Sequence, residues 1–139
     1  MTVEKRLESL QRKYEEALVP IRKKTIEIDF DKNRIEIKKP IAFAKRRPPD
    51  SSAAFDEKKV DEAEDTIADL AAVISNYMER MVVEGHTGGV SDPISYWEEL
   101  ANNRAQLIVE TLVKQGVRKN LLEARGEPGG GAKVSWLVN

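Results

Sequence analysis

The sequence predicts an α+β fold in which helices cover one face of a β-sheet, a two-layer sandwich. Three observations lead to this prediction. Segments with a helical period alternate with short segments of strand-like alternation. Their order along the chain is helix, β-hairpin, helix, strand, helix, strand, strand. The 139 residues, 40% of them hydrophobic, are enough for the core of one domain.

Composition narrows the classes of function. The formal net charge of -1 gives no reason to expect a nucleic-acid partner. With no cysteine, disulfides, thiolate metal ligands and cysteine nucleophiles are excluded. No apolar run approaches the ~20 residues of a transmembrane segment. The N-terminus leads into charged sequence rather than a signal peptide. The location stays unknown: the cell envelope if an export signal lies outside this sequence, otherwise the cell interior.

Residues 2–18 are predicted to form a helix that Pro20 ends. Its apolar positions recur at spacings of four and three, as a narrow seam of Val3, Leu7, Leu10, Tyr14 and Ala17. We favour a helix that packs on its own domain or serves as a linker. The alternative is a seam for a partner protein. We therefore divide the chain into an N-terminal helical extension, residues 1–20, and a domain over residues 21–139.

Residues 24–43 are predicted to form a β-hairpin. Two alternating runs, 26–30 and 35–38, flank the turn residues 31–33, and Pro40 interrupts the pattern. Residues 44–55 follow as an irregular loop that contains Lys45-Arg46-Arg47. This basic triplet is either a contact for phosphate or an acidic partner or, as we favour, a solvated loop.

Residues 56–78 have the strongest helical pattern. One face is apolar: Val60, Ala63, Ile67, Leu70, Ile74 and Tyr77. The acidic residues between them are expected to be solvated and show no metal-ligand spacing: Asp61, Glu62, Glu64, Asp65 and Asp69.

A buried strand over residues 81–84, a loop over 85–95 and a helix over 96–115 follow. Ser95 and Glu98 fit a capping box, and Asp92-Pro93 offers a competing helix start one turn earlier. Gly116 is the expected C-cap glycine. The core face of the helix is predicted to be Trp97, Leu100, Ala101, Ala105, Ile108 and Leu112.

The chain ends with a turn over 117–120, a short strand over 121–124, a glycine-rich loop over 126–131 and a last strand over 132–138. The glycine run could cradle a phosphate, but no Lys-Ser/Thr follows it. A hairpin-like connection is the favoured interpretation.

The stretch from Arg80 to Ala105 is the best candidate for a ligand site. It combines a strand, a glycine-rich loop with backbone donors, and a helix that carries a cation. His86, the only histidine, has no serine, cysteine or carboxylate constellation around it, so a structural role is favoured. We expect a binding module that is not an enzyme and uses no cofactor or metal.

Several residue groups in this stretch and in the sequence after it match a known family in order and spacing. They are Val83-Glu84-Gly85-His86-Thr87, Leu100-Ala101-Asn102-Asn103-Arg104-Ala105, Gly116-Val117, and the strand 121–126 that ends in glycine. The chain resembles the OmpA-like C-terminal domain family over roughly residues 35–138. The resemblance implies a β-α-β-α-β sandwich with mixed strand pairing and, in many members, non-covalent binding of peptidoglycan in the bacterial envelope.

In that family an aspartate after the Gly-His/Tyr-Thr and the arginine of Arg-Ala grip the charged end of diaminopimelate. A zwitterionic end needs one anion and one cation, and arginine can hold a carboxylate with two hydrogen bonds. By this resemblance Arg104 is the cationic grip. Gly88 stands where the aspartate should be, Trp97 where an asparagine should be, and Ala101 where a serine should be.

Asp92 is a candidate replacement for the missing carboxylate, but a helix cap is the simpler role. The resemblance thus gives a candidate site of Arg104, Asp92, Thr87, Gly88 and His86. Two hypotheses follow. In the first, the chain is a peptidoglycan-type binding module with a degenerate site for the stem peptide. In the second, it is a protein-interaction or scaffold domain of a larger protein or complex that binds no peptidoglycan.

Overall fold

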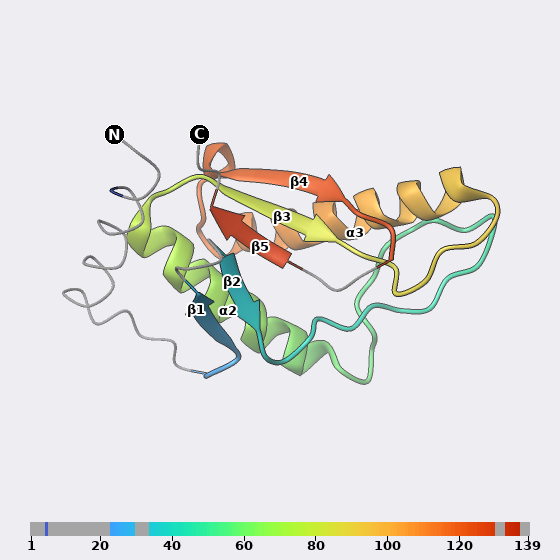
Figure 1. Ribbon diagram of the computed structural model, residues 1–139. Helices are drawn as coiled ribbons and strands as arrows, with labels where there is room; N and C mark the ends of the chain where they lie inside the picture. Colours follow the sequence, from blue (N-terminus) through green and yellow to red (C-terminus); the bar gives the residue numbers. More distant parts are fainter. Residues whose placement is uncertain (1–4, 6–22, 30–33, 130–132, 137–139) are drawn as a thin grey trace.

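The computed structural model describes residues 5, 23–29, 34–129 and 133–136 (Figure 1). The elements found there are β1 (Ile26–Asp29), β2 (Arg34–Ile37), α2 (Val60–Tyr77), β3 (Met81–Gly85), α3 (Ile94–Lys114), the short 3-10 helix η1 (Lys119–Leu121), β4 (Leu122–Gly126) and β5 (Lys133–Trp136). The predicted α+β class is confirmed. No helix in these described segments is long and apolar enough to cross a membrane.

The strands form one mixed sheet in the order β1-β2-β5-β3-β4. β3 and β4 are parallel, with α3 as the crossover between them, and the other neighbours pair antiparallel. Figure 1 shows α2 and α3 together behind the sheet as drawn, which gives the two-layer arrangement. Because β2 and β3 are each antiparallel to β5, they point the same way, and the segments that follow them leave from the same end of the sheet.

A single hydrophobic core fills the space between the sheet and the helices. The predicted apolar face of α2 lies in it, apart from Val60, which is only partly buried. All of the first three residues of β3 are buried, as predicted for this apolar run. Most of the largest fully buried side chains come from the two helices: Ile67, Leu70, Val73, Ile74, Leu100, Ile108 and Leu112. Such burial is the main favourable term for folding.

The predicted β-hairpin is confirmed, and its register pairs Ile26 with Ile37 and Ile28 with Ile35. The prediction of a solvated acidic face on α2 is wrong for Asp69, which is 2% exposed. Its carboxylate accepts hydrogen bonds from the backbone N–H of Lys23, and from both the N–H and the hydroxyl of Thr25. Asp69 therefore fastens the chain that enters β1 to the middle of α2, and three donors offset the cost of burying its charge.

The predicted capping box at Ser95 is wrong, because α3 begins at Ile94 and its N-cap is Pro93, with no side-chain cap hydrogen bond. The C-terminal prediction is confirmed. Gly116 has φ +98°, and the N–H groups of Gly116 and Val117 donate to the carbonyls of Val113 and Leu112. This pair of bonds is the Schellman arrangement, which needs a left-handed residue at the position of Gly116.

The helix predicted over residues 2–18 lies outside the described residues, apart from Lys5. The turn 31–33 and part of the glycine run 126–131 also lie outside them. The division at residue 20 and the partner-binding seam therefore stay predictions.

Candidate functional site

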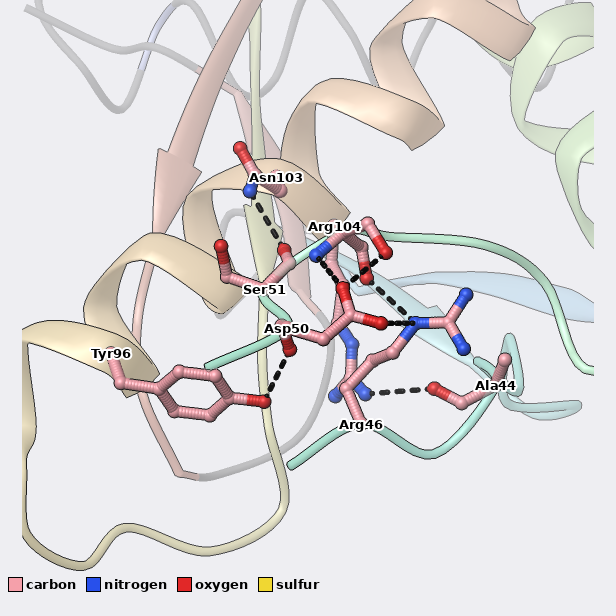
Figure 2. Close-up of polar contacts among 8 residues, drawn as sticks. Ala44, Arg46, Asp50, Ser51, Tyr96, Asn103 and Arg104 are labelled. Carbon is pink, nitrogen blue, oxygen red and sulfur yellow. Dashed lines mark hydrogen bonds and ion pairs between the residues drawn. The ribbon is translucent and has the colours of Figure 1, made fainter. Parts of the chain in front are cut away.

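Arg104 is the centre of the candidate site (Figure 2). It lies at the middle of α3 and is 8% exposed. Its Nη1 donates to the carbonyl of His86 at 3.0 Å, and its Nη2 donates to the carbonyl of Ala44 at 3.3 Å. The guanidinium carbon lies 5.0 Å from the centre of the Phe43 ring, within the range of a cation–π contact. The side chain thus bridges the segments that leave β2 and β3.

The charge of Arg104 is not balanced by a carboxylate among the described residues, which contain no ion pair to it. Burial is the main reason that its pKa lies below the usual value; Tyr96 raises it again and the charge of Arg46 lowers it further. Neither Glu84 nor Glu99 forms an ion pair with it in this part of the structure. A guanidinium has five N–H donors, so two backbone carbonyls leave donors for another acceptor.

His86 contacts Arg104 through its backbone carbonyl. Its ring forms no hydrogen bond or ion pair with an acidic or nucleophilic side chain among the described residues. Its ring meets the Phe43 ring edge-on at 6.1 Å, and its Nδ1 is buried without a hydrogen-bond partner among the described residues. Burial, and then the charge of Arg104, lowers the pKa of His86. Both effects favour the neutral form of the imidazole, and the backbone carbonyl of His86 is the group that accepts from Arg104.

Thr87 and Gly88 shape the loop after β3. The Thr87 hydroxyl donates to the carbonyl of Gly89 and accepts from the N–H of Gly129, so it ties this loop to the one after β4. Gly88 has φ +80°, and a Cβ there would meet no atom within 4 Å. The position thus favours glycine for its backbone, and its Cα faces open space rather than Arg104.

Asp92 forms no hydrogen bond or ion pair with Arg104 in the described part of the chain. It is exposed, and it makes neither a cap bond at the start of α3 nor an ion pair there. Trp97 was predicted to belong to the core face of α3, and this is wrong. Trp97 is only partly buried and packs edge-on against Tyr96, which is the buried aromatic residue.

Sequence reasoning missed the 50–52 loop (Asp50, Ser51 and Ser52), which lies across the first turns of α3 (Figure 2). The Tyr96 hydroxyl donates to the carbonyl of Asp50 at 2.7 Å, and the Asn103 amide donates to the carbonyl of Ser51 at 2.8 Å. In return the Ser51 hydroxyl donates to Glu99 at 2.9 Å. These α3 residues are spaced by three and four, so they share one face of the helix. Local sequence patterns carry no information on such distant pairings.

The Asp50 carboxylate is held from two sides. Its Oδ1 accepts from the N–H and the hydroxyl of Ser52, at 3.0 and 2.6 Å, and its Oδ2 lies 3.7 Å from Nε of Arg46. The hydrogen bonds from the Ser52 hydroxyl and N–H, with a smaller contribution from Arg46, keep the pKa of Asp50 below its usual value. Arg46 also donates to the carbonyl of Ser52. The predicted solvated loop 44–55 is thus partly ordered by its own polar groups.

A surface hollow of about 500 Å³ adjoins this cluster. Its lining residues come from the segment after β2 and from the approach to α2: Ala44, Lys45, Arg46, Ala54, Phe55, Asp56, Glu57 and Lys58. Three cations and two anions line it, so it suits a ligand with mixed charge better than a bare apolar group.

With this geometry in place, the sequence was compared with known proteins. The model of the OmpA family matches residues 49–133, which is more than half of the chain. The chain belongs to the OmpA family. The match begins just before the 50–52 loop and includes β3, α3 and Arg104. A comparison with curated protein sequences gives no match.

Solved structures give the same fold. A MotB-like protein from Desulfovibrio vulgaris has a TM-score of 0.64 and 16% identity, with 96% of this chain and 93% of that chain covered. The cell wall anchor of the T6SS from Pseudomonas aeruginosa has a TM-score of 0.54 and 14% identity, with 94% and 97% covered. The OmpA-like domain of FopA1 from Francisella tularensis has a TM-score of 0.50 and 14% identity, with 81% and 77% covered. At these identities the likeness concerns the fold alone.

Proposed function

We propose that this OmpA-family chain is a non-catalytic binding module that holds a carboxylate of a peptidoglycan stem peptide through Arg104. The site is a degenerate version of the diaminopimelate grip that the family resemblance implies. Such a role places the protein in the cell envelope. The cell wall anchor among its structural neighbours supports this choice of ligand, since that protein is described by a cell-wall role.

The observation that carries the proposal is the unbalanced charge of Arg104. The residue is 8% exposed, and its guanidinium is fixed by two backbone carbonyls and a ring and lacks a carboxylate partner within the described residues. A buried charge without a counterion is costly, and a ligand carboxylate would offset that cost. Because Ala44 and His86 already orient the guanidinium, little further ordering is needed on binding.

A second candidate is a scaffold domain that has lost the ligand. One observation favours it: Trp97, at the position where the family resemblance implies an asparagine, packs on Tyr96 with ring centres 4.9 Å apart. Its Nε1 is buried without a partner in the described part of the structure. An aromatic ring there removes a polar group that the ligand would otherwise use.

The test is co-sedimentation with purified peptidoglycan, for the wild type and for Arg104→Ala. We expect the wild type to be retained. Loss of a charge-assisted contact of about 1.5–3 kcal/mol should lower the affinity of the variant by roughly ten- to a hundredfold. Arg104→Lys should also bind poorly, because a lysine cannot hold two carbonyls and a planar carboxylate together.

Arg125→Ala is the matched control. It also removes one positive charge, but Arg125 is exposed on β4 and pairs with Glu123. Its retention should equal that of the wild type. Thermal unfolding of each variant shows whether the fold is kept. A wild type that does not sediment overturns the proposal in favour of the scaffold, and equal retention of a folded Arg104→Ala shows that Arg104 is not the grip.

A further inference from the structure

We propose that Asp50 is the anionic half of the ligand site, and that it receives the ammonium of a zwitterionic amino-acid end whose carboxylate binds Arg104. The carboxylate missing at Gly88 is thus replaced from a different segment, the one that follows β2. This inference rests on the proposed function, because it concerns the same ligand.

The Asp50 carboxylate is ordered although it is exposed. Its side chain is 56% exposed. Its backbone carbonyl accepts from Tyr96, the next carbonyl accepts from Asn103, and Oδ1 accepts twice from Ser52. Exposed aspartates on loops are usually mobile and lose entropy when they bind a ligand. Because Asp50 is already held by these hydrogen bonds, ligand binding carries little further entropic cost.

Asp50 is also linked to Arg104 along two paths. In one, Arg104 donates to Ala44, Arg46 follows two residues later, and Nε of Arg46 lies 3.7 Å from Oδ2 of Asp50. In the other, Asn103, the residue before Arg104 in α3, donates to the carbonyl of Ser51, the residue after Asp50. Figure 2 shows both steps of the first path, the bond from Arg104 to Ala44 and the ion pair between Arg46 and Asp50.

Oδ2 is the oxygen left for a ligand. Its separation of 3.7 Å from Arg46 exceeds the usual hydrogen-bond range of about 2.7–3.2 Å, so the contact is an ion pair at long range. An ammonium carries three donors and would form a shorter bond there. Arg104 and Arg46 then complement the charge of the ligand carboxylate, and Asp50 complements the charge of its ammonium.

The other candidates in the chain fit less well. Asp92 makes no contact with Arg104 or its neighbours among the described residues, and a side chain at Gly88 would start from a left-handed backbone and enter open space. Asp56, which lines the adjoining hollow, accepts from the N–H of Lys58 and is not joined to Arg104 or Arg46 by any contact among the described residues. Asp50 is therefore the carboxylate that the fold holds in place beside this cluster.

The experiment compares two ligands by calorimetry. One is the tripeptide L-Ala-γ-D-Glu-meso-diaminopimelate. The other carries 2-aminopimelate at the last position, which keeps the terminal carboxylate and lacks the terminal ammonium. We expect the wild type to prefer the first ligand by about tenfold, as one charge-assisted hydrogen bond would give. In Asp50→Asn the preference should disappear, while binding of the second ligand stays as in the wild type.

Asp92→Asn is the matched control, since it makes the same chemical change in the other loop, and it should keep the preference. A preference that survives in Asp50→Asn, or that is lost in Asp92→Asn, overturns the role of Asp50 and leaves the proposed function standing. Equal binding of both ligands by the wild type does the same. If the wild type binds neither ligand, the proposed function fails and the role of Asp50 fails with it.

Discussion

Two loops flank Arg104, and they hold it in different ways. The loop after β3, residues 86–93, contains glycines at 88 and 89 and offers Arg104 one backbone carbonyl, that of His86. The segment after β2, residues 44–56, offers the carbonyl of Ala44 and adds an arginine and an aspartate with fixed positions. The first loop has the sequence pattern of the family site, and the second has the charges.

This comparison shows that the loop with the family pattern contributes a backbone carbonyl to Arg104, whereas the charged side chains lie on the other segment. Gly85 explains why the pattern after β3 persists. A Cβ at this position would collide with the backbone of Ala101 and Ala105 on α3. The strand end and the helix approach so closely here that only glycine fits. The glycine at the end of β3 therefore has a packing role in this fold.

The largest expected effect is on folding. Gly85→Ala should lower the free energy of unfolding by about 1–3 kcal/mol or more, because the added methyl group meets backbone atoms that cannot move aside. Chemical denaturation measures the change. Gly89→Ala, in the loop that follows β3, is the control. A Cβ at Gly89 would meet no atom within 4 Å, so the effect of this change should stay within about 0.5 kcal/mol. Equal effects at both positions would contradict the packing role of Gly85.

A smaller effect concerns pH and His86. Its pKa is lower in the folded protein than in the unfolded chain, so the unfolded state takes up the proton first. Stability from this group is present above the unfolded pKa of about 6.5 and is lost as the pH falls through the folded pKa. His86→Gln should therefore show a shallower fall in the free energy of unfolding between about pH 7 and 5.

The chain has only one histidine, so the difference between these two pH profiles isolates it. Parallel profiles would contradict a lowered pKa for the partly buried imidazole beside Arg104. If added ligand changes the pH profile of the wild type but not that of His86→Gln, the imidazole contributes to ligand binding. The loop after β3 would then do more than offer a backbone carbonyl.

Much of the fold could be predicted, because its signals are local. The period of α2 marks its buried face, the apolar run of β3 marks a strand covered on both sides, and Gly116 marks the end of α3. Predictions of exposure failed where a distant partner decided the outcome. Asp69 looked like one more surface acid, but its partners Lys23 and Thr25 lie more than forty residues away.

The site divides in the same way. Arg104 and His86 could be found, because both stand in one short stretch with a family pattern. Asp50 could not, because its position depends on Tyr96 and Asn103, which are 46 and 52 residues from the carbonyls that they bind. The proline-rich sequence around Asp50 predicted only an irregular loop.

The central claim is that Arg104 is a preset cation that takes a ligand carboxylate. It is tested most directly by NMR of the arginine Nε–H groups during titration with the diaminopimelate tripeptide. We predict that the Arg104 resonance moves and saturates with the ligand, because its free donors acquire a charged acceptor. The resonance of Arg125 on β4 should stay in place. An Arg104 resonance that does not move at saturating ligand would contradict the account.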